Sequence, residues 1–584
     1  MLLSRLKESK YSTLILASIF AFTLFLQCCY FHYQAFHSIL ISSLWNNPIS
    51  FFTFYAPKIS ISLFIASFVF LLKRKSWIIY VSFLVSIWCI AELVYFRANG
   101  IFLDAYSFTM ISNMEGFWGA ISMYIYDTDF FIFLPSFLLF LSYYISDKNK
   151  RNVQTYFIFL LISIIIHIFS FYSVYYTLFK RPGGLHDYKL VYINPFSDIG
   201  VRRFWGFTSI EYLQITSPLH KLIYEIKSFL LLPFNVDTYI LNDNEIAIVN
   251  QFLESNKCNY SDEHNKLIVI LVESFETWAL VDEVMPNLLK FTDSNNIIYY
   301  KRIISQPKFA MSADGQMIVN TGLLPINEGA TCFRFPVNTY PALGKLYNSS
   351  LGLIPGNPSV WNQKRMSEAY GIKNNIYDSS SNDSILFSRL SYFLYNYDYI
   401  LAITMASHNP FDSYADKSDL KLVDGMPLTM SNYLKSISYT DKYLKQFLSR
   451  IQSDSILQNS TIVITGDHTI FPSEIRKEFS DYCKANNLDY KVEENYCPLI
   501  IYSPNIKEKT IVDEVAYQMD IYPTILHVIG AEDYYWKGFG VNLLDSVARQ
   551  NRPISPEDAF ELSDKLIRAN YFKEIEDSLY SQNY

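Results

Sequence analysis

The sequence predicts two parts of different kinds: an N-terminal bundle of five membrane-spanning helices and an α/β domain after it. Three observations support this prediction. Long apolar stretches dominate the chain before Tyr176, whereas the chain after Asn242 has the mixed composition of a soluble domain. Short apolar runs rich in β-branched residues then alternate with helical patterns, as in a layered α/β domain. Basic residues cluster in alternate loops of the apolar part.

Five apolar segments qualify as membrane-spanning helices. A bilayer crossing needs about 20 mostly apolar residues, and the second and fourth segments are short by that measure. The segments are residues 11–31, 56–72, 77–96, 130–145 and 156–176. The first is long for a signal peptide and lacks a small-residue cleavage site before Tyr30, so we interpret it as a retained helix.

The basic residues predict the orientation of these helices. Loops 32–55 and 97–129 hold no Lys or Arg apart from Arg97, whereas the other connections are basic. The basic residues are Arg5, Lys7, Lys10, Lys73, Arg74, Lys75, Lys148, Lys150 and Arg151. Because positive loops stay on the cytoplasmic side, we expect a multi-pass protein with a cytoplasmic N-terminus. Five crossings then place everything after Tyr176 outside the cytoplasm.

Four regions follow from these patterns. The bundle covers residues 1–178, a linker region 179–265, the α/β domain 266–545 and a C-terminal tail 546–584. The amphipathic stretch 219–232 of the linker region is interpreted as packed on the bundle, with contact to lipid as the alternative. The tail is interpreted as either a terminal helix or a loosely held segment. The helical patterns of the α/β domain are residues 283–291, 313–321, 342–348, 363–370, 430–451 and 517–529.

Charge and cysteine content limit the possible functions. The net charge of −7 argues against binding to nucleic acid, which favours a basic surface. Cys483 and Cys497 lie in the part predicted to be outside the cytoplasm, where a disulfide can persist. Their spacing alone leaves the pairing open.

Three apolar runs of the α/β domain end in residues that can bind a metal ion or handle a phosphate. Residues 267–272 lead into Glu273, residues 400–405 are followed by His408, and residues 461–465 lead through Gly466 to Asp467 and His468. Runs of this kind are typical of strands buried on both faces of a parallel sheet. Ligands of an open α/β sheet bind beyond the carboxyl ends of its strands, so we expect these side chains to converge.

Glu273, Asp467 and His468 are the predicted metal ligands. Two carboxylates and an imidazole offer the oxygen and nitrogen ligands that Zn²⁺ or Mn²⁺ accepts, and Gly466 would let the chain turn sharply before them. The alternative is structural: Asp467 would cap the next helix and His468 would pack in the core.

Ser312 is the candidate nucleophile. It lies where an irregular segment meets an amphipathic pattern, as the N-cap of a helix would. A helix N-terminus stabilises an anion, so a serine oxygen there could attack phosphorus and the phosphoserine would be held in place. The alternative is that Ser312 serves only as the cap.

His408 and Trp361 are weaker candidates. Pro410 disfavours a helix after His408, so this residue is expected on a loop, where it could donate a hydrogen bond to a phosphate oxygen or a leaving group. A histidine bonded within its own loop is the alternative. Trp361 could line a pocket, although a tryptophan so close to Pro358 is also typical of packing.

These motifs together resemble the alkaline phosphatase/sulfatase superfamily, and most closely its lipoteichoic acid synthase branch. The matching pieces are LVESF with Glu273, SADGQ with Ser312, VWNQ with Trp361, ASHNPF with His408, TGDH with Asp467 and His468, and MDIYPTILHVIG. The branch has five transmembrane helices before an extracytoplasmic catalytic domain. The resemblance therefore implies a sulfatase-like α/β domain in a bacterial cell membrane protein.

The resemblance also implies a site. It implies one divalent cation, typically Mn²⁺ with Zn²⁺ or Mg²⁺ as alternatives, held by Glu273, Ser312, Asp467 and His468. His408 and Trp361 match family residues near the bound phosphate and head group. The chain departs from the branch by having Ser312 where Thr is usual. It also has Gln363 in place of an Arg, for which Arg334 or Arg365 could substitute.

The function implied is transfer of a phosphoglycerol or similar unit from a phospholipid donor, through a phosphoserine, to an envelope glycan or lipid. One alternative is phosphoethanolamine transfer to lipid A or a glycan, and another is a non-catalytic membrane sensor or scaffold. Hydrolysis of sulfate esters is disfavoured because Ser312 is not followed by the Pro and Arg of the C/S-x-P-x-R motif.

Overall fold

The computed structural model describes residues 12–44, 48–99, 102–103, 124–143, 152–175, 213, 216–231, 239–254 and 265–581, except 328, 424, 452 and 471–472. The described residues up to 231 form one compact unit, called the helical unit, and those from 239 form a second, called the α/β unit. Each unit has its own apolar core. The basic residues at positions 5, 7, 10, 148, 150 and 151, and Cys258, lie outside the described residues.

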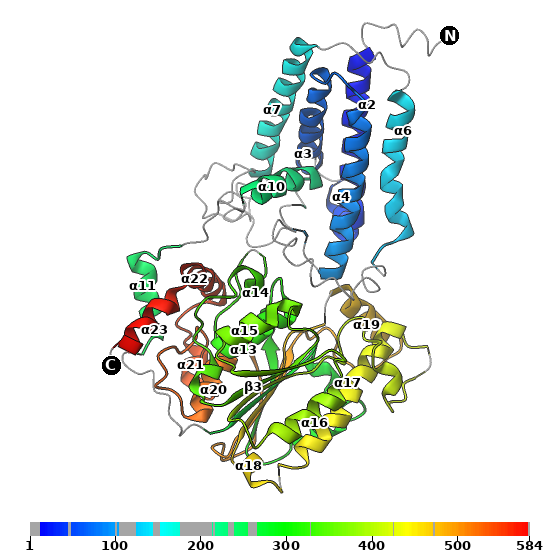
Figure 1. Ribbon diagram of the computed structural model, residues 1–584. Coiled ribbons are helices and arrows are strands. Elements are labelled where there is room, and N and C mark those ends of the chain that lie inside the picture. The colour runs from blue at the N-terminus through cyan, green and yellow to red at the C-terminus, as the bar shows by residue number, and fades with distance from the viewer. Residues whose placement is uncertain are drawn as a thin grey trace. The chain divides into compact units, whose positions relative to one another are not determined.

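The helical unit is built from apolar helices (Figure 1). They are α2 (Ser12–Leu44), α3 (Pro48–Ser67), α4 (Trp77–Asn99), α6 (Leu134–Tyr143), α7 (Val153–Tyr175) and α10 (Pro218–Leu231). Among the described residues, three stretches are long and apolar enough to cross a membrane, namely Thr13–Phe36, Trp77–Arg97 and Val153–Ser170. The stretch Phe54–Phe70 is shorter. All five predicted segments are helical over much of their length, while the five crossings and their orientation stay predictions.

The prediction of a loop at residues 32–55 is wrong, because most of this segment is helical. Helix α2 continues to Leu44, with a kink at Phe36, and α3 begins at Pro48. Neither Pro nor Gly occurs between residues 32 and 47, so nothing in the sequence interrupts the helix. Pro48 occupies the first position of the next helix, where its missing N–H costs nothing.

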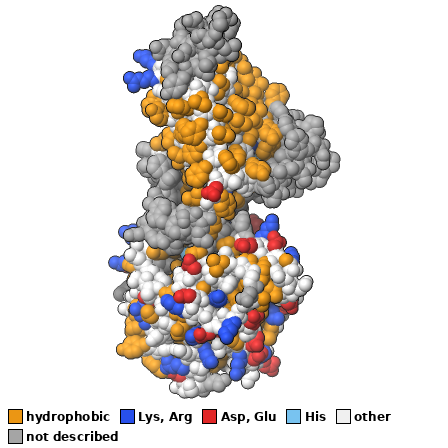
Figure 2. Space-filling view, turned by 90° about the vertical axis from the view of Figure 1, so that its right-hand side faces the viewer, with side chains coloured by type: hydrophobic (Ala, Val, Ile, Leu, Met, Phe, Trp, Pro, Cys, Tyr) orange, Lys and Arg blue, Asp and Glu red, His pale blue; other side chains and the backbone are white. Residues whose placement is uncertain are grey.

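Exposed side chains differ between the two units. Apolar side chains cover the visible face of the helical unit, whereas acidic and basic side chains are scattered over that of the α/β unit (Figure 2). On α7 alone the exposed apolar residues include Phe157, Leu161, Ile164 and Ile168. A helix that is apolar all round is stable only where its surroundings are apolar, which is the property of a membrane span.

The α/β unit contains one eight-stranded sheet with the order β4-β3-β5-β1-β6-β7-β2-β8. The strands are β1 (Leu267–Val272), β2 (Ile297–Ile304), β3 (Ser350–Pro355), β4 (Asn374–Asp378), β5 (Tyr399–Ile403), β6 (Thr461–Gly466), β7 (Cys497–Tyr502) and β8 (Thr510–Tyr517). The three predicted strands are confirmed as β1, β5 and β6, and they run parallel. The sheet is mixed rather than purely parallel, because β7 runs antiparallel to β6 and to β2.

Helices cover both faces of the sheet (Figure 1). On one face lie α12 (Pro286–Phe291), α16 (Asp383–Phe393), α17 (Leu428–Leu448) and α19 (Ser473–Ala485), which share a core with alternate residues of β1. On the other lie α13 (Met311–Thr321), α15 (Gln363–Ala369) and α20 (Ile521–Ile529). The helix expected over 342–348 is instead a short 3₁₀ turn, Leu343–Leu346. Its Gly344 has no room for a side chain beside Tyr370 O, so the segment is shaped by close packing.

The C-terminal segment is helical and firmly packed. It forms α22 (Pro556–Ala569) and α23 (Tyr571–Ser581). Ser563 Oγ accepts a hydrogen bond from Leu324 N at 3.0 Å, and Asp564 Oδ1 accepts one from Asn327 N at 2.9 Å. These buried groups tie the segment to the loop after α13, so the loosely held alternative is wrong.

Candidate cation and nucleophile site

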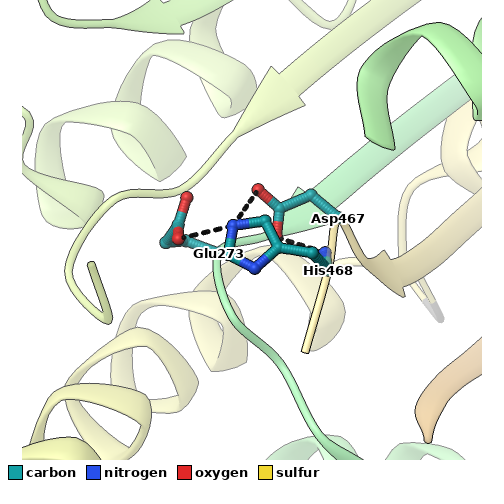
Figure 3. Close-up of side chains that lie close together, drawn as sticks. All are labelled: Glu273, Asp467 and His468. Atoms are coloured by element: carbon teal, nitrogen blue, oxygen red, sulfur yellow. Dashed lines mark hydrogen bonds and ion pairs between the residues drawn. The ribbon is translucent and has the colours of Figure 1, made fainter. Parts of the chain in front are cut away.

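Glu273, Asp467 and His468 meet at the carboxyl ends of β1 and β6. The two strands pair in parallel with Val272 opposite Gly466, so the residues that follow each strand leave the sheet at the same level. The ligand atoms of all three residues lie within 4.8 Å of one another (Figure 3). The side chains are buried, with 0% to 6% of their surface exposed. The sheet register therefore creates the convergence that the sequence predicted.

Ser312 joins these three residues. Its Oγ donates a hydrogen bond to Glu273 Oε2 at 3.0 Å and lies 3.2 Å from His468 Nε2. Helix α13 approaches this closely because it has Gly315 one turn later: a Cβ there would lie 2.2 Å from Asp467 O. Glu273, Ser312, Asp467 and His468 are called the strand-end cluster below.

The expectation that Ser312 caps its helix is wrong. The N-cap of α13 is Ala310, and Ser312 is the second helical residue. Asp314 stabilises this helix start instead, because its Oδ2 accepts from the backbone N–H groups of Lys308, Phe309 and Ala310 at 3.0–3.1 Å. The Ser312 hydroxyl is thereby left to the cluster.

Opposing effects set the protonation of the cluster. Burial by itself lowers the pKa of His468, but the Asp467 and Glu273 carboxylates outweigh this and raise that pKa to about 10. Burial and the neighbouring Glu273 raise the pKa of Asp467 to about 7. Burial disfavours ionised Glu273 as well, yet the His468 imidazolium holds the pKa of Glu273 below its ordinary value. A proton on His468 thus balances two buried negative charges.

The residues fit a divalent cation. Asp467 Oδ2 is buried without a hydrogen-bond partner, and His468 Nε2 is 3.7 Å away from it. His468 Nδ1 lies 2.8 Å from Thr469 O, which can only accept, so Nδ1 donates and Nε2 is the ligand atom. Two carboxylates, one imidazole and a hydroxyl form a donor set that suits Mn²⁺ or Zn²⁺.

Neighbouring side chains that sequence reasoning missed hold the cluster in place. Ser274 adopts a positive φ of 52°, and its N–H donates to Asp467 Oδ1 at 3.0 Å. Glu273 N donates to Thr404 Oγ1 at 3.0 Å, and Ser407 Oγ donates to Glu273 O at 2.5 Å. Thr404 and Ser407 follow β5, so their position at a third strand end was the available signal.

His408 lies on the loop after β5, as predicted. Its Nδ1 is 2.7 Å from Asn409 O and therefore donates to it. His408 is also among the groups that hold the pKa of the Glu273 carboxyl below its ordinary value, after His468. His408 is thus beside the cluster without being one of its hydrogen-bonded members.

Trp361 and Arg334 belong to a different group of contacts. The Trp361 ring lies 6.3 Å from that of Phe333, and the Arg334 guanidinium is 5.3 Å from the ring of Phe335. Among the described residues, no hydrogen bond or ion pair of the strand-end cluster involves Trp361 or Arg334. Residues 331–336 and 355–363, called the rim segments below, provide these side chains.

Gln363 stands where the resemblance leads one to expect an arginine. Its side chain is 5% exposed, and its Nε2 donates to Gln316 Oε1 on α13 at 3.1 Å. The amide therefore packs the rim segments against α13.

One expectation from local sequence is corrected, and one open question is answered. Gly466 does not adopt a left-handed turn; it is required because a Cβ would lie 2.5 Å from Phe275 O and 2.9 Å from Cys497 Sγ. Cys483 and Cys497 are both free and buried, so the disulfide left open by their spacing is absent. Cys497 lies within the sheet and Cys483 on helix α19.

Two family models match the chain in different places. The model described as the lipoteichoic acid synthase N-terminal domain matches residues 3–197, and the sulfatase model matches residues 362–531. The second match includes His408, Asp467 and His468. The two matched regions correspond to the apolar helices and to much of the α/β unit.

Relatives match over most of the chain. The lipoteichoic acid synthase of Staphylococcus saprophyticus is 23% identical over 88% of this chain and 82% of its own length. Lipoteichoic acid synthase 2 of Bacillus subtilis is also 23% identical, over 88% of this chain and 80% of its own length. Among solved structures, the lipooligosaccharide phosphoethanolamine transferase A of Neisseria meningitidis shares the fold. It has a TM-score of 0.51 and 9% identity over 88% of this chain and 96% of its own. In its N-terminal apolar helices, its sulfatase-like α/β unit and its whole-length matches, the chain is similar to the lipoteichoic acid synthases.

Proposed function

We propose that this protein is a membrane-bound phosphotransferase that moves a phosphoglycerol unit from a phospholipid to an envelope glycan or lipid, by way of phosphorylated Ser312. The observation that carries the proposal is the position of Ser312 Oγ, 3.0 Å from Glu273 Oε2 and 3.2 Å from His468 Nε2. A hydroxyl held this close to a buried cation-binding set is suited to attack phosphorus. The curated relatives are lipoteichoic acid synthases, which supports phosphoglycerol as the unit transferred.

The proposed cation ligands are Glu273, Asp467, His468 and Ser312 Oγ, with Mn²⁺ as the proposed ion. When bound, a divalent cation would lower the pKa of the serine hydroxyl and offset the charge of the phosphate oxygens. The unpartnered, buried Asp467 Oδ2 supports this assignment.

Two displacements at phosphorus complete the proposed reaction. Ser312 Oγ passes its proton to Glu273 Oε2, with which it is hydrogen-bonded, and bonds to phosphorus, while the bond from phosphorus to the diacylglycerol oxygen breaks. His408 is the proposed donor of a proton to that oxygen. The hydroxyl of the acceptor then passes its proton to His408 and attacks the phosphoserine, and Ser312 leaves as a free hydroxyl with the proton returned by Glu273. Trp361 and Arg334 are the proposed contacts for the head group.

The membrane location fits a lipid donor, whose head group can reach the site while its acyl chains stay in the bilayer. We propose five crossings, a cytoplasmic N-terminus and an extracytoplasmic α/β unit in a bacterial cell membrane. The bounds 1–178, 179–265, 266–545 and 546–584 remain the proposed regions.

Phosphoethanolamine transfer is the second candidate, favoured by the fold shared with the Neisseria enzyme over 88% of this chain. Both reactions would use the same cluster. Incubating the protein with phosphatidylglycerol and with phosphatidylethanolamine distinguishes the two by which lipid is consumed.

Ser312→Ala tests the proposal. Without the hydroxyl, release of diacylglycerol from labelled phosphatidylglycerol should fall by roughly a thousandfold or more. Ser436→Ala is the control, since Ser436 is buried in the same unit and its hydroxyl donates to its own helix at Tyr433 O. Undiminished turnover in Ser312→Ala would remove Ser312 as the nucleophile, and loss in both variants would indicate a folding defect.

A further inference from the structure

A second cluster of buried polar groups lies within the helical unit. It combines His32 of α2, Lys58 of α3, His167 of α7 and His220 of α10, and is called the basic cluster below. Lys58, His32 and His220 are fully buried. Ionisable groups inside a membrane bundle are costly, so they are retained where they bind something.

Contacts among the four helices bring these side chains together. Lys58 Nζ lies 3.7 Å from the centre of the Phe54 ring, and the His32 ring lies 4.6 Å from the same ring. On α3, two residues after Lys58, Ser60 Oγ lies 3.4 Å from His167 Nδ1. The His220 ring stacks on that of His167 at 5.7 Å, and α10 lies across the ends of α3 and α7 (Figure 1).

Polar atoms of the cluster lack partners. Neither ring nitrogen of His32 has a hydrogen-bond partner, and His220 Nε2 has none. Lys58 Nζ has three N–H groups, and within the described residues it donates only to Phe54 O, at 2.8 Å. Buried donors normally have hydrogen-bond partners. We therefore expect these groups to bind a ligand that supplies acceptor atoms.

The charge of the basic cluster indicates whether its ligand is an anion or a cation. In the part of the chain that the structure describes, no carboxylate pairs with Lys58. The neighbouring Glu92 and Glu225 already bind Lys221, at 2.9 and 3.4 Å. An unpaired buried ammonium is destabilising, and an anion removes that cost.

The depth of the cluster identifies the kind of anion. His32 lies four residues before the end of the apolar stretch Thr13–Phe36, and Lys58 lies four residues after the start of the stretch Phe54–Phe70. Both therefore lie about one helical turn inside the boundary of the apolar region, although α2 and α3 themselves extend beyond these stretches. Lipid phosphates lie at that boundary.

We propose that the basic cluster binds a phosphate group, supplied by a membrane phospholipid, with Lys58 as the main cationic contact and His32 and His220 as hydrogen-bond donors. Charge-assisted hydrogen bonds from an ammonium and imidazoles to phosphate oxygens satisfy the unpartnered atoms. This site is separate from the strand-end cluster and does not depend on the phosphotransferase proposal.

Binding is tested on the purified full-length protein carrying Ser312→Ala, so that lipid is not consumed. Native mass spectrometry compares phosphatidylglycerol with a diacylglycerol of the same acyl chains, and inorganic phosphate is added as competitor. Lys58→Met should weaken retention of phosphatidylglycerol at least tenfold, and Lys58→Arg should keep most of it. Lys75→Met is the matched control, since Lys75 is equally buried but bonds to Thr13 Oγ1.

Folding is separated from binding by His32→Leu. This variant replaces an unpartnered polar ring by an apolar side chain, so it should fold at least as well and still bind less lipid. Phosphate binding that depends on Lys58, without lipid binding, would assign the site to free phosphate. Equal retention of phosphatidylglycerol by the parent, Lys58→Met and His32→Leu proteins, or equal retention of diacylglycerol and phosphatidylglycerol, would overturn the proposal.

Discussion

The strand-end cluster and the rim segments differ in how they are built. Every member of the cluster bonds to another member or to a neighbouring strand end. Three of its four members follow strands whose register is fixed by backbone pairing, and Ser312 lies on α13. The rim segments are turns and short helices, and their side chains contact each other and α13. The cluster is thus positioned by the sheet itself, whereas the rim depends on individual side-chain contacts.

This difference matters for function. In the proposed reaction the cation would be held at the sheet edge, where backbone pairing fixes the positions of its ligands. The proposed head-group contacts lie on turns and short helices, which can change without disturbing the sheet. Gln363, which occupies the position of the expected arginine and bonds to Gln316, is such a change.

Among the changes that separate the strand-end cluster from the rim segments, Asp467→Asn should have the largest effect. Asn keeps an oxygen for Ser274 N and His468 N but removes one of two buried charges. We expect Mn²⁺ affinity to fall by at least about a hundredfold, equivalent to roughly 2.7 kcal/mol, measured by calorimetry. With a chelator present, the free energy of unfolding of this variant should exceed that of the parent by about 1–2 kcal/mol. The reason is that the buried carboxylates of residues 467 and 273 no longer repel each other. Unchanged Mn²⁺ affinity would exclude Asp467 as a ligand.

Removal of the cation should give the next largest effect. A ligand at 100 times its Kd stabilises a protein by about 2.7 kcal/mol, so EDTA should lower the thermal midpoint of the α/β unit by roughly 5 °C. Differential scanning calorimetry with Mn²⁺ restored afterwards measures this change. Asp467→Asn provides the control, since it should respond little to EDTA. An identical midpoint in both conditions would mean that the cluster holds no stabilising ion.

Arg334→Ala should affect the rim alone. If the guanidinium contacts the head group, KM for phosphatidylglycerol should rise about tenfold, which is roughly 1.4 kcal/mol, with Mn²⁺ affinity unchanged. Arg365→Ala is the matched variant, because Arg365 is exposed on α15. A larger rise for Arg365→Ala would transfer the assignment to that residue, and no rise in either would remove both.

Gln363→Ala should give the smallest effect on catalysis. It leaves Gln316 Oε1 buried without its partner, so the free energy of unfolding should fall by about 1 kcal/mol. Because Gln363 bonds within the protein, KM should change less than threefold. The double variant Gln316→Ala/Gln363→Ala should lose less stability than the sum of the single variants, and strict additivity would show that the two amides do not interact.

Much of the fold and the cluster could be read from the chain. Three β-branched runs, which lead to Glu273, to His408 and to Asp467 with His468, predicted three parallel strands and a shared edge, because side-chain pattern and strand burial are local properties. The apolar helices were equally visible in the sequence, since hydropathy is a property of consecutive residues.

Other features depend on contacts between distant residues. No short stretch of sequence encodes three of these features. They are the antiparallel direction of β7, the packing of α22 against the loop after α13, and the stabilisation of the α13 N-terminus by Asp314 rather than by Ser312. The requirement for Gly466 likewise comes from Phe275 and Cys497, which only the folded sheet brings near.

The basic cluster shows the same limit most clearly. His32, Lys58 and His220 are isolated polar residues in apolar stretches, and sequence patterns gave no reason to group them. Local sequence chooses helices and strands because backbone hydrogen bonds and burial act between near neighbours. Sites form where register and helix packing bring together side chains far apart in the chain, and those contacts are settled only when the whole unit has folded.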